Sequence, residues 1–327
     1  MRTSEGEGVP RGQDVDWRSV DWPRARHAVY EVHQRYAYAY SGAVEHVRQR
    51  LVMIPRERHG DQRLLEDSLA VTGAESSSVS WEADPFGNHV ARVWTPHVEH
   101  ELAFEVRYRV ARDTGAASRS TLAREWGDGR YLESTALTAP NDTLRAVADD
   151  LLRDGDGKTA AGHLALAERV HAWAAAAIAY QIGVTGVQTP AAMALHLGKG
   201  VCQDYAHLMI SVSRLVGIPA RYVSGHLLGE GAPHAWVEAL IADANDLGQP
   251  EVVAFDPTHH RRAGLNYITV AVGRDYADVA PTSGTFVGAA SGQLTASKHA
   301  EIVEIVYEDG TVWGRTSAAA QDAESAA

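Results

Sequence analysis

A single cysteine, a histidine and an aspartate are the residues with which this chain could carry out nucleophilic chemistry. Cys202 is the only cysteine among 327 residues, and it follows a glycine-rich turn at 198–200. His234 opens an apolar run after a second glycine-rich loop, and Asp256 ends a short apolar run in front of a proline. A histidine can take the proton of a thiol, and a carboxylate can orient that histidine. The three residues therefore predict a catalytic triad.

The elements around these residues are expected to bring them together. Apolar residues recur at helical spacing after Cys202, up to the stop signal Gly-Ile-Pro at 217–219. A thiol at a helix N-terminus lies at the positive end of the macrodipole, which favours the nucleophilic thiolate. The runs 235–241 and 252–255 are predicted to be strands, so a carboxylate at the end of one can reach an imidazole on the other.

The same residues also have a structural interpretation. A lone cysteine is often a small buried apolar residue, and a histidine in an apolar run is often a hydrogen-bonded core residue. An aspartate before a proline is common in turns. Residue order alone leaves both interpretations open.

Five stretches resemble motifs of the bacterial transglutaminase-like superfamily, in the order in which the family has them. They cover the nucleophile, the segment after its helix, the histidine, the aspartate and the following loop, at 200–209, 215–225, 234–238, 255–258 and 273–281. The resemblance implies a papain-like α+β catalytic fold in which Cys202, His234 and Asp256 carry the triad. It also implies chemistry of the transglutaminase, peptidase or amidase type, without choosing among them.

The region before the catalytic motifs has the pattern of strands. Apolar and polar residues alternate over 102–110, the tyrosines at 36, 38 and 40 alternate as well, and 47–54 is a further strand candidate. We predict an antiparallel, sandwich-like β domain over 27–113, whose layout also resembles the N-terminal region of the same family. The predicted fold class is therefore α+β: this β domain followed by a papain-like, transglutaminase-like catalytic domain.

The remaining boundaries follow from composition and from helix signals. Residues 1–26 are expected to form a flexible leader whose tryptophans, Trp17 and Trp22, could dock on the body of the protein. A linker rich in Gly, Ser and Thr is predicted over 114–140, the catalytic domain over 141–314 and a disordered tail over 315–327.

The expected reaction begins when Cys202 attacks a glutamine side-chain amide or a peptide bond. The backbone N–H of Cys202 is one expected donor to the oxyanion. Candidates for the second donor are Gln203, Tyr180 and Gln188, and candidates for the aromatic pocket wall are Trp236 and Tyr222. Water would resolve the thioester in a peptidase or amidase, and a primary amine would do so in a transglutaminase.

Composition limits the partners. The formal net charge of −12 disfavours nucleic acid, which needs a basic surface. No apolar run approaches the roughly 20 residues that span a bilayer. With no signal-peptide core and a thiol that must stay reduced, a cytoplasmic setting is expected. The expected partners are a peptide or protein substrate and, for a transglutaminase, a primary amine; no cofactor and no metal is expected.

Three other functions are alternatives to a cysteine-dependent enzyme. A non-catalytic binding or scaffold protein could retain the fold, although such proteins usually lose a triad member and none is missing here. A metallohydrolase could use His226, His234, His259 or His260, but no HExxH spacing occurs. A serine hydrolase is disfavoured because no G-x-S-x-G elbow occurs.

Overall fold

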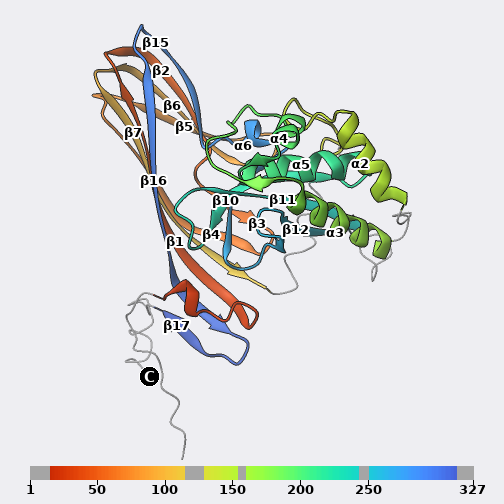
Figure 1. Ribbon diagram of the computed structural model, residues 1–327. Helices are drawn as coiled ribbons and strands as arrows, with labels where there is room; N and C mark the ends of the chain where they lie inside the picture. Colours follow the sequence, from red (N-terminus) through yellow and green to blue (C-terminus); the bar gives the residue numbers. More distant parts are fainter. Residues whose placement is uncertain (1–14, 115–128, 154–159, 243–249, 315–327) are drawn as a thin grey trace, which may run out of the picture.

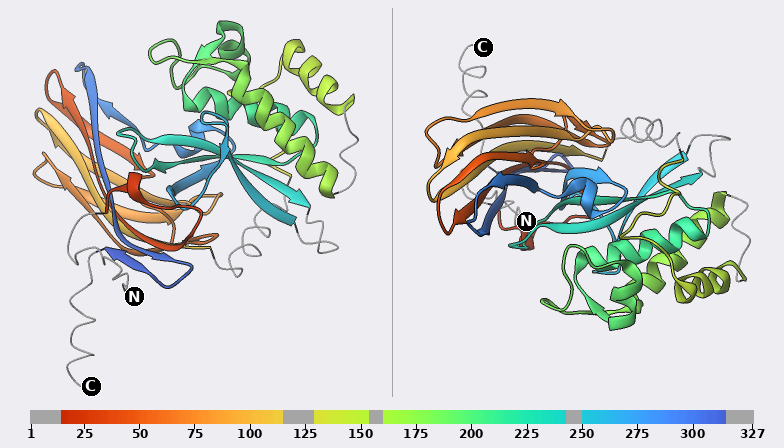
Figure 2. Two further views of the ribbon diagram at one scale, coloured as in Figure 1. Left: turned by 60° about the horizontal axis from the view of Figure 1, so that its bottom comes forward. Right: turned by 90° about the horizontal axis from the view of Figure 1, so that it is seen from above.

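The computed structural model describes residues 15–114, 129–153, 160–242 and 250–314, and it has the predicted α+β class. Two antiparallel sheets of long strands form one side of the molecule, and helices form the other (Figure 1). A five-stranded sheet lies between them, as the views in Figure 2 show.

The N-terminal part is almost entirely strand. Its elements are the 3-10 turn η1 (Trp17–Ser19) and the strands β1 (Ala25–Tyr40), β2 (Val44–Leu51), β3 (Arg58–His59), β4 (Gln62–Thr72), β5 (Ser78–Ala83), β6 (His89–Val98) and β7 (Glu101–Asp113). On β7 the residues at 102, 104, 106, 108 and 110 are all buried, as the alternation of the sequence predicts.

The middle of the chain supplies the helices and the central sheet. Its elements are α2 (Asp142–Arg153), α3 (Ala160–Ala177), β8 (Ala179–Tyr180), α4 (Ala191–Leu197), β9 (Lys199–Gly200), α5 (Cys202–Leu215), β10 (Ala220–Leu227), β11 (His234–Ala242), β12 (Pro250–Asp256), β13 (Arg261–Arg262), β14 (Tyr267–Gly273) and α6 (Tyr276–Val279). The central sheet has the order β13-β12-β11-β10-β14.

The C-terminal strands return to the N-terminal sheets. They are β15 (Thr282–Val287), β16 (Gly292–Tyr307) and β17 (Val312–Gly314). The two large sheets have the orders β17-β16-β1-β7-β4-β3 and β15-β2-β6-β5. The predicted catalytic range of 141–314 is therefore too long, because 282–314 pair with β1 and β2 rather than with the central sheet.

The described parts of the predicted leader and linker are ordered. Val15 bridges Ile302, and β1 begins within the predicted leader; Trp17 and Trp22 pack against the core, as expected. In the linker, Tyr131 is buried and its carbonyl accepts from the backbone N–H of Ala220 at 3.0 Å. Residues 1–14, most of the linker (115–128) and the tail at 315–327 lie outside the described residues.

Helix α5 is the centre of the helical layer. Every residue from 203 to 214 is buried, and the helix packs against β10 and β11 on one side and α2, α3 and α4 on the others. Neighbours therefore cover this helix on every side. It ends at the predicted stop: Gly217 has a φ of 82°, and the N–H of Ile218 donates to the carbonyl of Ser213 at 2.8 Å.

Buried polar contacts join the N-terminal sheets to the central sheet. Glu238 on β11 accepts from Arg221 at 2.7 Å and lies 2.8 Å from a ring nitrogen of His59. Burial alone would raise the pKa of Glu238, but the Arg221 guanidinium and His59 hold it well below its usual range. A buried charge needs such partners, so these contacts fix how the two parts of the molecule fit together.

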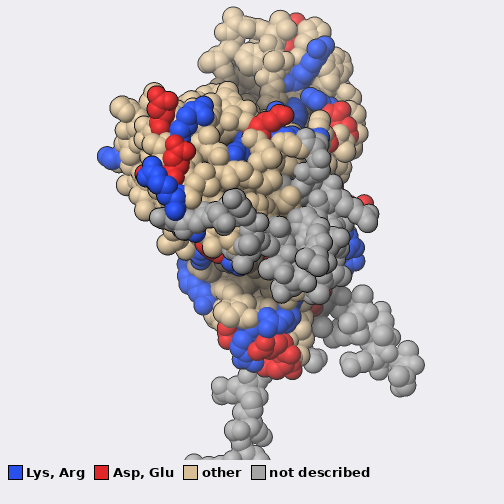
Figure 3. Space-filling model, turned by 90° about the vertical axis from the view of Figure 1, so that its right-hand side faces the viewer, with Lys and Arg blue, Asp and Glu red and all other residues tan. Residues whose placement is uncertain are grey.

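The surface is mixed in charge where it can be seen. On the face in Figure 3, acidic and basic side chains lie close together between broad uncharged areas. Among the described residues, no helix is both long enough and apolar enough to cross a membrane.

Candidate functional site

Cys202 is the first residue of α5, at the N-terminus of the buried helix, as predicted. The helix start is held by Asp204, whose Oδ2 accepts from the backbone N–H of Val201 at 2.8 Å and from the hydroxyl of Thr185 at 2.6 Å. A Cβ on Gly200 would lie 2.6 Å from this same oxygen, so the glycine is required for the close approach. The thiol is therefore placed by a capped and tightly packed turn.

A short parallel pairing holds the turn in front of the thiol. Tyr180 of β8 pairs with Gly200 of β9, and the N–H of Gln181 donates to the carbonyl of Gly200 at 2.8 Å. The turn begins at Gly198, which ends α4 in the left-handed conformation at φ 63°. Tyr180 is thereby placed next to the nucleophile turn.

His234, the first residue of β11, lies between the thiol and a carboxylate. Its Nε2 lies 2.8 Å from Oδ2 of Asp256, and its Nδ1 lies 3.2 Å from Oε2 of Glu230. Burial lowers the pKa of His234, but its interactions with Asp256, Cys202 and Glu230 outweigh burial and raise the pKa to about 11. The site thus stabilises the imidazolium strongly.

Asp256, the last residue of β12, is fully buried and accepts from several donors. Oδ2 accepts from the rings of His234 and His259, each at 2.8 Å, and from the hydroxyl of Tyr267 at 2.6 Å. Oδ1 accepts from the backbone N–H groups of Thr258 and His259 at 3.0 and 3.3 Å. Burial alone would raise the pKa of Asp256, but these bonds hold it far below its usual range. The group is therefore a carboxylate at neutral pH.

A third imidazole supports the backbone at the same point. His171, buried on α3, has its Nε2 3.1 Å from the carbonyl oxygen of Asp256. Because a carbonyl oxygen only accepts, this nitrogen carries the proton and donates. Burial lowers the pKa of His171, which favours the neutral ring that this role needs.

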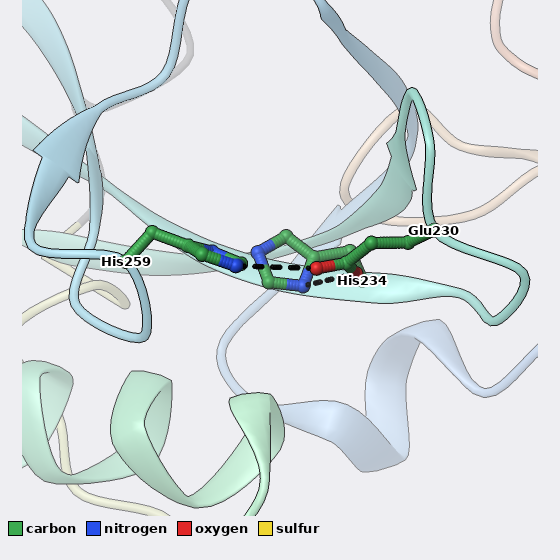
Figure 4. A group of neighbouring side chains, drawn as sticks. All are labelled: Glu230, His234 and His259. Atoms are coloured by element: carbon green, nitrogen blue, oxygen red, sulfur yellow. Dashed lines mark ion pairs between the residues drawn. The ribbon is translucent and has the colours of Figure 1, made fainter.

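Glu230 and His259 complete a compact group with His234. The carboxylate of Glu230 lies 3.2 Å from Nδ1 of His234 and 3.3 Å from Nε2 of His259. Figure 4 shows Glu230 extending from its loop towards the two rings, with His259 on the opposite side and the ring of His234 between them. The pKa of Glu230 is lowered, because the two histidines outweigh its partial burial.

The loop that carries Glu230 is held by the N-terminal and C-terminal parts of the chain. Gly229 has a φ of 89°, and a Cβ there would lie 2.3 Å from the Trp17 ring. The Nζ of Lys298, on β16, donates to the carbonyl of Ala232 at 3.0 Å. The position of the loop therefore depends on residues outside the helical half.

The structure separates the three candidates for the second oxyanion donor. The side-chain amide of Gln203 donates to the carbonyl of Val187 at 3.3 Å and is buried. Gln188 is exposed on the adjacent loop. Tyr180 is 55% exposed, and the pKa of its phenol is raised by partial burial and by the nearby charges of Cys202 and Glu230. Tyr180 is the candidate with a described electrostatic link to the thiol.

The two pocket-wall candidates are buried behind the site. Trp236 stacks on His234 with 6.2 Å between ring centroids and meets Tyr267 edge to face at 5.3 Å. Tyr222 is fully buried and packs against His207 of α5 at 5.2 Å. Both therefore support the site from the inside and do not reach the surface.

The histidines considered for a metallohydrolase do not form one cluster. His226 is buried beside Gln34, 3.0 Å from its side-chain nitrogen, and His260 packs against the ring of His171. The remaining two, His234 and His259, do lie together with Glu230, and their nearest ligand atoms are all within 4.8 Å of one another.

Glu230 and Tyr267 were missed from the sequence, and His259 was named only as a possible metal ligand, not as a neighbour of the triad. Glu230 stands four residues before His234 in the glycine-rich loop, and His259 three residues after Asp256. Their proximity to predicted triad members was the available signal. Tyr267 gave no such signal, because it lies on β14, which β10 and β11 separate from β12 in the sheet.

Comparison with known proteins confirms the predicted family. Residues 145–251 match the model of the transglutaminase-like superfamily, and residues 30–111 match that of the bacterial transglutaminase-like N-terminal region. The chain thus carries a transglutaminase-like core behind the N-terminal region typical of the bacterial proteins.

The curated relatives do not add an activity. An uncharacterized protein of Mycobacterium leprae is 37% identical over 50% of this chain, and an uncharacterized protein of Mycobacterium tuberculosis is 38% identical over 32%. The matched stretches cover 57% and 36% of those two proteins, so the chain spans only part of the length of the relatives it matches.

A solved structure shares the fold. A crystal structure from Cytophaga hutchinsonii, provisionally described as a cysteine protease, superposes with a TM-score of 0.65. The match covers 85% of this chain and 92% of the other at 21% identity. The predicted papain-like α+β class is confirmed by this likeness.

Proposed function

We propose that this transglutaminase-like chain is a cysteine-dependent amide hydrolase in which Cys202, His234 and Asp256 act as a triad. One observation carries the proposal: the imidazole of His234 interacts with the thiol of Cys202 and lies 2.8 Å from a buried carboxylate. The three side chains come from a helix N-terminus and two neighbouring strands, which are rigid supports. The transglutaminase-like fold agrees with thiol chemistry of this kind.

In the proposed reaction, Nδ1 of His234 takes the proton of Cys202, and the thiolate attacks the carbonyl carbon of an amide. A C–S bond forms, and the carbonyl oxygen becomes an oxyanion. When this intermediate collapses, the C–N bond breaks and His234 gives its proton to the departing amine. Water, deprotonated by His234, then cleaves the thioester to a carboxylic acid and restores the thiol. Asp256 holds the ring and balances its positive charge throughout.

The oxyanion needs at least one fixed donor. Cys202 is the first helical residue, and the first hydrogen bonds of the helix are made further on, by the N–H groups of Asp204 and Tyr205 to the carbonyl of Val201. The N–H of Cys202 is therefore free of the helical ladder and available to the oxyanion. We assign the second donor to the phenol of Tyr180, on the strand beside the nucleophile turn.

The surface beside the thiol suits a peptide or protein substrate. Large apolar side chains are exposed along the segment that leads to the nucleophile, namely Tyr180, Ile182, Val187, Met193 and Leu197. Exposed apolar groups gathered on one segment are typical of binding surfaces. An apolar stretch of polypeptide laid over this segment would bring its amide to Cys202.

Water is the acceptor that the exposure of the site favours. The side chain of Glu230 is 34% exposed and Tyr180 is more than half exposed, so solvent reaches the surroundings of the thiol. Transfer to an amine competes well only where water is kept out. A primary amine is therefore the second acceptor to test.

The test is to incubate the protein with a glutamine-containing peptide, with and without a primary amine, and to measure the masses of the products by mass spectrometry. Hydrolysis adds one water and releases an amine; transfer gives the amine adduct instead. Cys202→Ala and His234→Ala should each lose on the order of 10⁴-fold or more in rate. His33→Ala, in an exposed pair with Glu105, is a matched control and should retain the full rate. Full activity of Cys202→Ala would disprove the mechanism.

The non-catalytic alternative predicts a different property of the thiol. Because Cys202 is the only cysteine, alkylation by iodoacetamide followed by mass spectrometry reports on this site alone. A triad thiol should react much faster in the native protein than in His234→Ala. Equal rates in the two proteins would favour a scaffold.

A further inference from the structure

We propose that Glu230, His234 and His259 form a Zn²⁺ site beside Cys202, and that the bound metal holds the enzyme inactive. The inference extends the proposed function, because the metal would use the nitrogen of His234 that serves the thiol. It begins from the group in Figure 4, whose carboxylate and two ring nitrogens lie within 4.8 Å of one another.

The separations match those of ligands around one small cation. With metal–ligand bonds of about 2.0–2.1 Å, neighbouring ligand atoms of a tetrahedral zinc site lie roughly 3.3 Å apart. Oε2 of Glu230 lies 3.2 Å from Nδ1 of His234, and Oε1 of the same carboxylate lies 3.3 Å from Nε2 of His259. Each ring nitrogen is therefore already at a ligand–ligand distance from one oxygen of Glu230.

The second set of contacts orients both rings for a metal. Asp256 is a carboxylate that only accepts, and it lies 2.8 Å from Nε2 of His234 and 2.8 Å from Nδ1 of His259. Each ring therefore donates a proton to Asp256, and a metal that displaces the second proton of His234 would find the lone pair of each ring facing Glu230. A carboxylate that fixes the far nitrogen of a ligand histidine is the usual support of zinc sites.

The types of ligand favour Zn²⁺, and their position means that the bound metal would inhibit the triad. Two imidazoles and one carboxylate suit Zn²⁺, whereas Ca²⁺ and Mg²⁺ prefer oxygen ligands alone. The thiol of Cys202 interacts with His234 and is the natural fourth ligand. A metal bound there takes both the base and the nucleophile, so it must inhibit the triad.

The test measures binding of Zn²⁺ by isothermal titration calorimetry to the full chain, stripped beforehand with a chelator. We expect one Zn²⁺ per chain, and binding weaker by at least about tenfold in Glu230→Gln and in His259→Ala. Both side chains are about one-third exposed, so these variants should keep the fold, and circular dichroism verifies that. His33→Ala removes a histidine paired with a glutamate elsewhere and should bind as the wild type does.

Inhibition is read separately, from alkylation of the thiol. Saturating Zn²⁺ should slow the reaction of Cys202 with iodoacetamide in the wild type, and much less in His259→Ala at the same concentration. Absence of one-to-one binding, or binding unchanged in both Glu230→Gln and His259→Ala, would overturn the site. Binding without slower alkylation would overturn the inhibition. Activity of the triad is assayed with chelator present, so the proposed function stands or falls independently.

Discussion

Replacing Asp256 by asparagine is the sharpest probe of the site, because both carboxylate oxygens accept hydrogen bonds and an NH₂ group in either position would face donors. Oδ2 accepts from His234, His259 and Tyr267, and Oδ1 accepts from two backbone N–H groups. An asparagine has one accepting oxygen and one donating NH₂ group. In either orientation the NH₂ faces groups that now donate, so at least two hydrogen bonds are lost or reversed.

The expected loss of activity follows from the ring of His234. Facing an NH₂ group, its Nε2 must accept, and the proton moves to Nδ1, the nitrogen that should take the proton of the thiol. The corresponding exchange in serine proteases lowers kcat about 10⁴-fold through the wrong tautomer. We expect a loss of the same order here.

The expected loss of stability follows from burial. Breaking a buried charged pair by changing one partner costs about 3–5 kcal/mol, and hydrogen bonds to charged groups contribute roughly 1.5–3 kcal/mol each. We therefore expect Asp256→Asn to lower the free energy of unfolding by about 3–5 kcal/mol. The variant stays folded only if the free energy of unfolding of the wild type exceeds this loss. Activity and the free energy of unfolding are therefore both measured.

The assays are alkylation of Cys202, amide turnover and urea unfolding followed by circular dichroism. Tyr267→Phe is the matched control: it removes one donor at 2.6 Å but leaves the carboxylate and both imidazole contacts. It should cost about 1.5–3 kcal/mol and keep the tautomer, so its rate should fall far less. If folded Asp256→Asn reacted and turned over like the wild type, Asp256 would have no part in setting the state of His234.

Three further changes test other parts of the structure. Gly200→Ala should slow alkylation of the thiol, because its Cβ would displace the capping carboxylate; Gly42→Ala, where a Cβ meets nothing within 4 Å, should not. Arg221→Met leaves Glu238 buried without its guanidinium partner, so urea unfolding should show a free energy of unfolding lower by about 3–5 kcal/mol. The double variant with Glu238→Gln should recover part of this loss. The carboxyls of Asp256 and Glu238 have lowered pKa values, so their stabilisation of the fold is complete well above the unfolded pKa values near 4 and is lost as the pH falls below them. Urea unfolding at pH 7 and at about pH 2.5 should show this loss, with a smaller change in Glu238→Gln.

Local patterns predicted the elements around the thiol. The helix after Cys202 and its end before Gly217 follow from the spacing of apolar residues and from glycine and proline signals, and both are where the sequence predicts them. His234 and Asp256 lie at the expected ends of β11 and β12. These features depend on residues close in sequence, which is why pattern alone suffices.

Features that depend on distant pairing escaped prediction. The strands at 282–314 have ordinary strand patterns, and nothing in them says that they pair with β1 and β2. Tyr267 likewise donates to Asp256 although β14 and β12 are separated in the sheet by β10 and β11, a placement that no local pattern gives. A strand pattern fixes which face of a strand is apolar, but not which neighbour it chooses.

The same distant pairing explains why the helical half is not structurally independent. The nucleophile stands on α5 and its two partners on β11 and β12, all within the central sheet and the helices. Glu230, however, stands on a loop whose glycine packs under Trp17 and whose carbonyl at Ala232 is bound by Lys298. A fragment limited to 141–281 would keep the elements that carry the triad but lose both contacts. The N-terminal and C-terminal strands therefore place the carboxylate that faces His234, and with it the charge beside the proposed catalytic thiol.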